Sequence, residues 1–407
     1  MHFLFETSAF NELDHFTPVA TQLLEDGHKV TYVMGDDSRL GLDSRVSFLK
    51  SFSHFEHVDH AALLNGRREQ IFRLLSRLWF GRLLRGLLPN HVRLSLLVLS
   101  SRFSGVFKDA SHLEFDCGIS GWGDPTSFLM TATLARRKPI VSLPHGYPCI
   151  KNEAFNREVR RIRAATGSLP DFSIRNSFRA YVVATERNKL MLQNWNVSAN
   201  VIEVWGNARF SPRWVRRLVE IVPPVNTDAL PSIAHRVLFL LPAPTSTFEG
   251  PDLVSLLDRL TELPILLILK PHTRNNTYRE VIPSSLLRKP NVVDLRDADT
   301  IRLVEMAETV INFATGAALD AIHLNKRLIF TKYLSTNSYS WEDCTGIRIA
   351  ESEDQCLKFV LDRSWSTDQA AVQPYVSQEV FVNGRISDPI SNYATRLCEI
   401  AATGVKR

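Results

Sequence analysis

Short runs of consecutive apolar residues, bounded by Pro, Gly or polar residues, recur along the whole chain. Two clear examples are residues 139–144, which lead into His145, and residues 264–269, which lead into Lys270. Runs of this length without polar alternation are typical of strands buried on both faces of a parallel sheet. Segments with helical spacing separate the runs, so the pattern predicts an α/β fold.

The amino-terminal pattern predicts a strand, a helix and a second strand. Residues 2–5 form the first expected strand, residues 6–16 a loop, and residues 29–34 the second strand. Thr17 and Pro18 stand where the N-cap and the first residue of the helix are expected, because Pro is common at the first helical position. This order is a βαβ unit, the building block of parallel sheets.

The chain of 407 residues is longer than one hydrophobic core normally supports, so two domains are expected. The alternation of strands and helices predicts a Rossmann-like domain over residues 1–211 and a second over residues 233–375. Residues 212–232, which contain two adjacent prolines, are interpreted as the linker. Residues 376–407 include a segment with helical spacing, and we expect them to return to the first domain.

Composition and charge narrow the class of protein. The contents of 44% apolar and 22% charged residues are typical of a folded soluble protein. The net charge of +5 favours anionic partners such as nucleotide phosphates, acidic glycans or a membrane surface. The five cysteines are scattered without a metal-ligand spacing, which favours free thiols in a reducing compartment. Neither a secretory signal nor an apolar run long enough to span a membrane is evident, so a cytoplasmic protein is expected.

Three segments are rich in arginine. We interpret residues 67–100 as two packed helices whose arginines reach solvent, and the alternative is a surface that rests on anionic lipid. Residues 157–163 and 213–217 are explained by solvated helix faces, since neither aromatic interleaving nor a recognisable nucleic-acid module accompanies them. Nucleic-acid binding is therefore not expected, although the second segment is also suited to the phosphates of a lipid-linked acceptor.

Small and polar residues near the end of the second domain predict a phosphate site. Thr315, Gly316 and Ala317 stand at an expected strand-to-helix junction, where free backbone N–H groups can hold an anion. Asp320, about one turn into that helix, is placed to accept hydrogen bonds from ribose hydroxyls. The structural alternative is that small residues permit close packing of helix on sheet, and that Asp in a first turn favours the helix dipole.

Two other expected strand ends in the second domain carry candidate ligand-binding residues. Lys270 and His272 follow the apolar run at 264–269. Their positive charge can balance the negative charge of a diphosphate leaving group. Thr245 and Ser246 follow another expected strand, and their hydroxyls can bind phosphate oxygens; a capped turn is the alternative.

Candidate acid–base residues lie in the first domain. His145 is followed by Gly146, which lets the chain turn sharply after the strand. Glu12 and Asp14 lie in the loop expected after the first strand, and Asp124 lies in a Gly-rich loop. A carboxylate at such an edge can take a proton from an acceptor hydroxyl. Asp14 and Glu12 are the first candidates for this base, ahead of Asp124, and each has the alternative of capping a loop.

The order of these segments resembles that of GT-B glycosyltransferases of bacterial surface-polysaccharide synthesis. The segments are the loop after the first strand, His145-Gly146, residues 205–210, Lys270-Pro-His272 and residues 315–320. Within that class the chain is similar to capsule and O-antigen transferases that use CMP-Kdo, and to CDP-glycerol glycerophosphotransferases. The resemblance spans about residues 1–333.

The resemblance implies two Rossmann-like domains that face a cleft, with an activated sugar held by the second. It implies that Lys270 and His272 contact the donor phosphate and that Thr315, Gly316 and Asp320 hold phosphate and ribose. His145 and a carboxylate base then act from the first domain. The implied partners are a nucleotide sugar as substrate, with a CMP, CDP or UDP donor, and a glycan or lipid-linked acceptor. Neither a cofactor nor a metal is implied, and the enzyme would associate peripherally with the inner face of the membrane.

Two further interpretations remain open. Nucleotide-sugar 2-epimerases share this architecture and rearrange the sugar that they hold, without any acceptor. A non-catalytic member would bind a glycan or a partner and would not bind a nucleotide.

Overall fold

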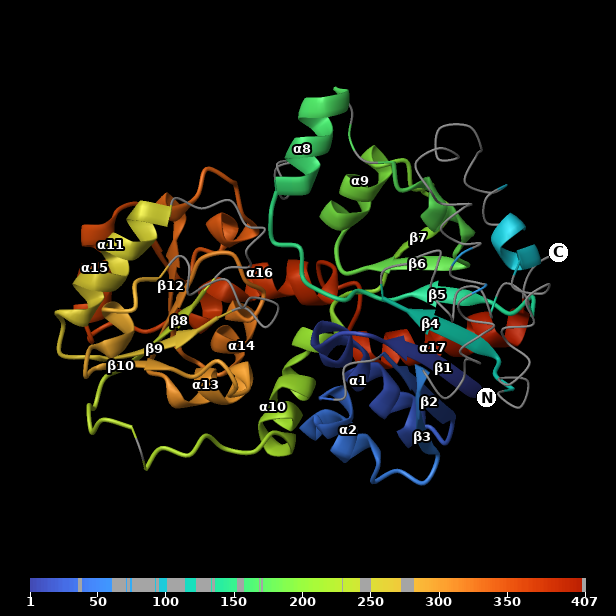
Figure 1. Ribbon diagram of the computed structural model, residues 1–407, viewed down its shortest axis with the longest axis horizontal. Helices are drawn as coiled ribbons and strands as arrows, with labels where there is room; N and C mark the ends of the chain where they lie inside the picture. Colours follow the sequence, from blue (N-terminus) through green and yellow to red (C-terminus); the bar gives the residue numbers. More distant parts are fainter. Residues whose placement is uncertain are drawn as a thin grey trace. The chain divides into compact units, whose positions relative to one another are not determined.

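The computed structural model describes residues 1–35, 39–60, 71, 74, 92, 95–100, 114–121, 133, 136–151, 157–167, 169, 171–228, 230–241, 250–271 and 282–404. These residues form two compact units, whose elements are labelled in Figure 1. Unit 1 contains Met1–Gly146, Asp171–Ser211 and Val380–Arg407, and unit 2 contains Tyr147–Pro170 and Pro212–Glu379.

Unit 1 is built on a parallel sheet of seven strands in the order β3-β2-β1-β4-β5-β6-β7. The order reverses between β1 and β4, which pair with Phe5 opposite Ile119. In such sheets ligands bind at the carboxyl ends of the strands beside this reversal, the topological switch point. The strands are β1 (His2–Thr7), β2 (Lys29–Met34), β3 (Phe55–Asp59), β4 (Cys117–Ser120), β5 (Ile140–Ser142), β6 (Ala180–Val183) and β7 (Ile202–Val204).

Unit 2 repeats this arrangement with six parallel strands in the order β10-β9-β8-β11-β12-β13. Its switch point lies between β8 and β11, where Leu240 is opposite Asn312. All five residues of β9 are buried, as expected for a central parallel strand covered on both faces. The strands are β8 (Arg236–Leu240), β9 (Leu266–Lys270), β10 (Val292–Asp294), β11 (Thr309–Asn312), β12 (Arg327–Thr331) and β13 (Arg348–Ala350).

Helices connect the strands. Those of unit 1 are α1 (Phe10–Glu25), α2 (Ser44–Leu49), α9 (Glu186–Asn194) and α17 (Pro389–Thr403), with short 3-10 turns at η1 (Leu40–Leu42), η2 (Ser173–Ser177) and η3 (Ala208–Phe210). Unit 2 contains α8 (Arg157–Thr166), α10 (Pro212–Ile221), α11 (Gly250–Thr261), α13 (Thr300–Met306), α14 (Ala318–His323) and α15 (Glu353–Leu361), with η4 (Leu286–Arg288), η5 (Lys332–Leu334) and η6 (Ser340–Asp343). Helix α16 (Gln369–Phe381) ends where unit 2 passes into the last segment of unit 1.

The first helix begins earlier than the sequence predicted. Residues 6–16 were expected to form a loop, but α1 starts at Phe10 and Pro18 lies inside it. The carboxylate of Glu12 accepts hydrogen bonds from Ser8, the residue before the N-cap, and so stabilises the first turn. The hydroxyl of Thr17 donates to the carbonyl of Leu13 (2.5 Å), so Thr17 bonds within the helix and does not cap its start.

The unit boundaries differ from the expected ones in two places. Residues 212–232 were interpreted as a linker, but they begin with α10, whose Trp214, Val215 and Leu218 are buried in unit 2. This helix packs against α13 and α14, and Arg302 of α13 donates to the carbonyl of Val222 (2.7 Å). Residues 147–170 also belong to unit 2, although the sequence placed them in the first domain.

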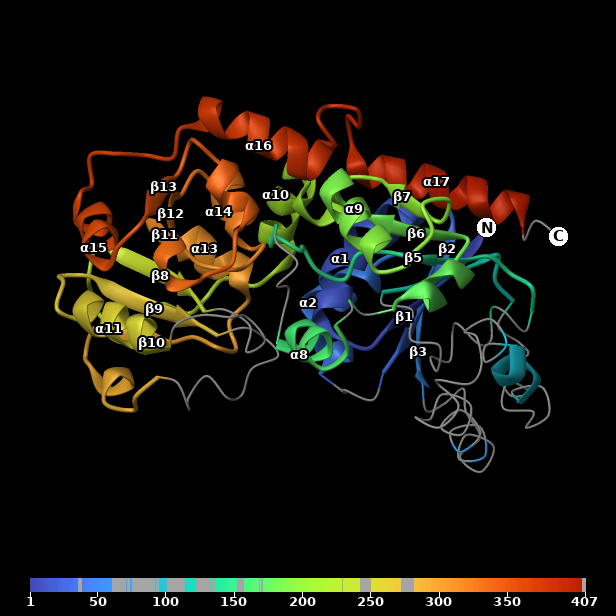
Figure 2. The same cartoon turned by 90° about the horizontal axis from the view of Figure 1, so that it is seen from above.

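The carboxyl-terminal segment returns to unit 1, as predicted. Figure 2 shows α17 running along this unit, where it packs against α1. The hydroxyl of Tyr393 donates to the carbonyl of Gly206 (2.9 Å), and its ring meets Trp205 edge-on with centroids 5.2 Å apart. Among the helices that the structure describes, none is both long and apolar enough to cross a bilayer.

Replacement of Tyr393 by Ala should destabilise unit 1 by about 3–5 kcal/mol, because it removes a buried aromatic ring from the contact with Trp205. Replacement by Phe should cost only about 1 kcal/mol, since just the hydrogen bond to Gly206 is lost. Chemical denaturation of both variants measures the difference. Equal stability of the Ala variant and the wild type would contradict the described packing of α17.

Candidate functional site

Glu12 lies at the switch point of unit 1. Its Oε2 accepts hydrogen bonds from the backbone N–H of Ser8 (2.6 Å) and from the Ser8 hydroxyl (3.0 Å), directly after β1. Gly121 follows β4, and a Cβ at this glycine would lie 2.7 Å from Oε1 of Glu12. The two neighbours place this carboxylate at the carboxyl ends of both strands, where Rossmann-like sheets bind ligands.

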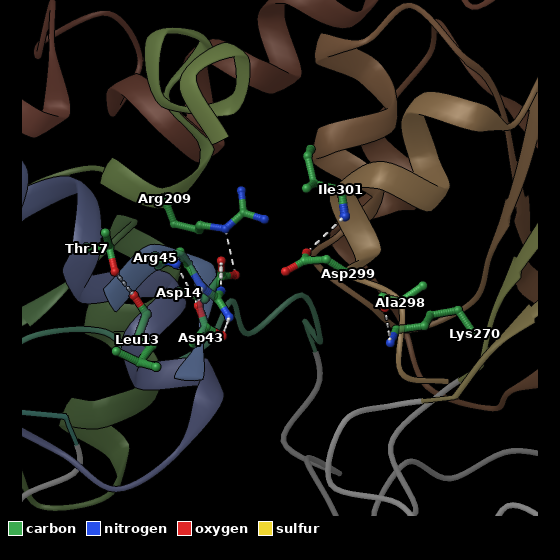
Figure 3. Close-up of polar contacts among 10 residues, drawn as sticks. All are labelled: Leu13, Asp14, Thr17, Asp43, Arg45, Arg209, Lys270, Ala298, Asp299 and Ile301. Atoms are coloured by element: carbon green, nitrogen blue, oxygen red, sulfur yellow. Dashed lines mark hydrogen bonds and ion pairs between the residues drawn. The ribbon is translucent and has the colours of Figure 1, made fainter. Parts of the chain in front are cut away.

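Asp14, one position further along α1, is held between two arginines, as Figure 3 shows. Its Oδ1 accepts from Nη1 of Arg45 (2.7 Å) and its Oδ2 from Nε of Arg209 (2.6 Å). Burial raises the pKa of Asp14, but the charges of Arg209 and Arg45 outweigh burial and lower the pKa below its ordinary value. A carboxylate with both oxygens engaged and a low pKa is a weak base, so the arrangement favours a structural role for Asp14.

Arg45 and Arg209 are functional candidates that the sequence did not single out. Both guanidinium groups are largely buried, and Arg45 also forms a two-point contact with Asp43 at 2.7 and 2.8 Å. Arg209 lies in η3, at the end of the segment 205–210 that follows β7. Its position within that segment is the one feature of the sequence that could have identified Arg209 as a functional candidate. For Arg45 no signal exists, since its partner Asp14 lies 31 positions away.

His15 is buried next to this network. Burial lowers its pKa to about 4, and the charges of Arg209 and Arg45 act in the same direction against the attraction of Asp14. The ring meets Phe210 edge-on, with centroids 6.2 Å apart. His15 is therefore neutral at neutral pH.

Lys270 in unit 2 points its ammonium group at backbone carbonyls. Nζ donates to the carbonyl of Ala298 (2.7 Å), as Figure 3 shows, and to the carbonyl of Arg296 (2.5 Å), both in the loop between β10 and α13. The next residue, Asp299, caps α13 by accepting from the N–H of Ile301 (3.4 Å). Two of its three N–H groups hold a neighbouring loop, and the expected contact of Lys270 with a donor phosphate stays a prediction. Burial lowers the pKa of Lys270, which is 5% exposed.

The turn after β11 is fixed by its own polar side chains. Oδ1 of Asn312 accepts from the N–H of Thr315 (3.2 Å), and Oγ1 of Thr315 accepts from the N–H of Ala317 (3.3 Å). The Nδ2 group of Asn312 is buried and has no hydrogen-bond partner among the described residues, which is uncommon for a buried donor. Gly316 lies in this turn and remains partly accessible.

Asp320 does not reach the surface of unit 2. It lies in α14, a helix of six residues, and is fully buried. The sequence predicted contact with a ribose, but burial of this side chain favours the alternative, in which Asp320 in the first turn of α14 interacts with the helix dipole.

The remaining candidates divide into two groups. His145 is partly exposed and follows β5 at the end of the first segment of unit 1. Asp124, Thr245, Ser246 and His272 lie outside the described residues. Within the described ranges, no group of three or more His, Cys, Asp or Glu side chains is arranged to hold a metal ion.

Replacement of His15 by Gln should make the free energy of unfolding depend less on pH below about pH 6.5. The folded pKa near 4 lies below the ordinary value of 6.5, so between these limits the unfolded chain binds a proton that the folded chain does not. The stabilisation is complete above pH 6.5 and is lost as the pH falls toward 4. Unfolding free energies at pH 7 and pH 4.5 should therefore differ less in the variant than in the wild type. An equal difference in both proteins would show that His15 titrates normally.

Comparison with known proteins identifies the type of fold. No family model and no curated protein sequence matches the chain. The fold is similar to that of UDP-GlcNAc 2-epimerase from Neisseria meningitidis bound to UDP-GlcNAc (TM-score 0.58, 13% identity, 99% of this chain and 100% of that one). It is similar to that of the UDP-N-acetylglucosamine 2-epimerase from Rickettsia bellii (TM-score 0.58, 13% identity, 100% of this chain and 97% of that one). It is also similar to that of Anabaena HepE in complex with UDP and glucose (TM-score 0.52, 13% identity, 99% of this chain and 100% of that one). The likeness over whole chains confirms the predicted α/β architecture, two Rossmann-like domains of the GT-B type.

Proposed function

We propose that this protein is a glycosyltransferase that binds a nucleotide-activated sugar through unit 2 and transfers the sugar to a glycan acceptor. The observation that carries this proposal is the switch point of unit 2, between β8 and β11. A turn of small and hydroxyl-bearing residues follows β11 there, and ligands bind at such edges in α/β sheets.

The structure of this edge suits an anionic ligand. The hydrogen bonds from Asn312 and Thr315 hold the turn in a fixed shape before any ligand arrives, which lowers the entropic cost of binding. Strands β9, β8 and β11 are neighbours, so the loop braced by Lys270 lies at the same edge of the sheet. The similar structures that carry UDP-GlcNAc, or UDP and glucose, support a nucleotide sugar as the ligand.

We assign the base to Glu12 because its carboxylate lies at the switch point of unit 1, where the neutral N–H and hydroxyl groups of Ser8 donate hydrogen bonds to its Oε2. In transfer, the acceptor oxygen bonds to the anomeric carbon as the bond from that carbon to the nucleotide phosphate breaks. The base takes the proton of the acceptor hydroxyl, and hydrogen-bond donors stabilise the charge on the departing phosphate. Asp14 keeps Arg45 and Arg209 in place.

The finer assignment follows the resemblance to surface-polysaccharide enzymes. It favours CMP-Kdo, or a related CMP, CDP or UDP donor, and an acceptor that is a bacterial surface glycan or its lipid-linked precursor. Peripheral attachment at the inner face of a membrane belongs to the same assignment.

A nucleotide-sugar 2-epimerase is the second candidate, since two of the similar structures with a TM-score of 0.58 are such epimerases. Incubation with the nucleotide sugar alone separates the two functions. An epimerase converts the donor into its 2-epimer without an acceptor, whereas a transferase releases the sugar from its nucleotide only when an acceptor hydroxyl or water attacks the anomeric carbon. Release of CMP from CDP-glycerol would instead identify a glycerophosphotransferase.

A thermal-shift screen with CMP, CDP, UDP and GDP should show stabilisation by at least one nucleotide. A ligand at 100 times its Kd contributes about 2.7 kcal/mol, a shift that is readily measured. Thr315→Ala should reduce the shift, because the turn loses the hydrogen bond from Ala317. Thr345→Ala removes an exposed hydroxyl elsewhere in unit 2 and serves as the matched control. Absence of any shift in the wild type would refute the proposed donor site.

Glu12→Gln should lower kcat by at least about 100-fold, since an amide cannot take a proton. The fold should survive because the amide oxygen can still accept the N–H of Ser8. Asp14→Asn is the contrasting variant: it leaves Arg45 and Arg209 without their shared carboxylate and should cost about 3 kcal/mol of stability. Its folded fraction should keep most of the turnover. Full activity of Glu12→Gln would exclude Glu12 as the base.

A further inference from the structure

Tyr147 packs directly on the turn that follows β11. A Cβ added at Gly316 would lie 2.8 Å from Cβ and 3.0 Å from Cδ1 of Tyr147, so no larger residue fits without a shift. The backbone of Gly316 does not have the positive φ that favours glycine. The glycine is therefore required by the approach of Tyr147 and not by the conformation of the turn.

Hydrogen bonds fix the other end of the Tyr147 side chain. Its hydroxyl donates to Oε2 of Glu379 (2.5 Å) and lies 3.1 Å from the hydroxyl of Tyr375 and 3.3 Å from that of Ser340. The hydroxyls of Ser340 and Tyr375 are 2.9 Å apart. Glu379 is fully buried, and a hydrogen bond to a carboxylate is stronger than one between neutral groups.

The backbone around Tyr147 is also held within unit 2. The carbonyl of Cys149 accepts from the N–H of Ser340, and the N–H of Lys151 donates to the carbonyl of Ser338, both at 2.7 Å. Nζ of Lys151 forms an ion pair with Asp343 at 2.8 Å. The backbone and the hydroxyl of Tyr147 are thus fixed and its ring lies against Gly316, so the side chain can adopt few other conformations.

We propose that Tyr147 is a positioning residue of the nucleotide site: its ring sets the turn at Gly316, and Glu379 sets the ring. This inference rests on the proposed function and adds residues that the sequence did not connect with the turn. The ligand is the phosphate portion of the nucleotide sugar, which the turn between Asn312 and Ala317 binds. Loss of the Tyr147 hydroxyl frees the ring to move and loosens the turn.

Three variants and one control variant test the role of the hydroxyl. Tyr147→Phe and Glu379→Ala should each raise the Kd of the nucleotide that stabilises the wild type by about tenfold, the effect of one lost charge-assisted hydrogen bond. In both variants the KM for the donor should rise together with this Kd, and kcat should change much less. Glu379→Gln keeps an acceptor for the tyrosine hydroxyl and should restore most of the affinity. Tyr339→Phe removes another buried tyrosine hydroxyl of unit 2, bonded to Ser335, and should leave Kd unchanged.

A double-mutant cycle tests the contact itself. Gly316→Ala in the wild type should raise Kd by about tenfold or more, because the new Cβ collides with that of Tyr147. In a Tyr147→Gly background, where that Cβ is absent, the same change should have little effect. An equal effect in both backgrounds would show that Gly316 acts on the ligand directly and would overturn the inference.

The outcomes separate this inference from the proposed function. A wild type that binds none of the four nucleotides would refute both. A wild type that binds one of them, with Tyr147→Phe and Glu379→Ala binding equally well, would refute the role of Tyr147 alone. If Tyr147→Gly does not fold, those two variants decide the question by themselves. Variants that lose only thermal stability, with an unchanged Kd, would assign Tyr147 to packing.

Discussion

Parallel pairing on both sides of one central strand is the constraint on which the structure depends. In unit 1 this strand is β1, and in unit 2 it is β8. Because every neighbour runs in the same direction, all carboxyl ends meet at one edge of each sheet, and the chain must cross back between strands. The strand order reverses beside the central strand, which leaves space for a ligand at that edge. The polar residues of both candidate sites lie at this edge.

The carboxylates of these units acquire different properties from the groups that surround each of them. Asp14 faces two guanidinium groups, which lower its pKa and occupy both oxygens. Glu12 accepts from the N–H and hydroxyl of Ser8, and Glu379 accepts from the hydroxyl of Tyr147. A residue type alone therefore does not identify a base, since charge balance, geometry and burial decide which carboxylate can take a proton.

Interactions between segments distant in the sequence explain most differences from expectation. Lys270 binds carbonyls 26 and 28 positions further on, and Tyr147 binds Glu379 across 232 positions. The positions of prolines explain the two misplaced boundaries: Pro18, expected at the start of a helix, lies inside α1, and the adjacent prolines at 223 and 224, interpreted as part of a linker, follow the end of α10 at Ile221.

The sequence by itself determined the class of fold, the two Rossmann-like units and the return of the last helix. Apolar runs and helical spacing are local properties, and parallel pairing follows from them with few alternatives. Only the tertiary structure decided that Lys270 braces a loop, that Asp320 is buried, and that Tyr147 packs on Gly316. The reason is physical: hydrogen bonds, burial and close contacts depend on distances in space, and residue spacing along a chain does not contain them.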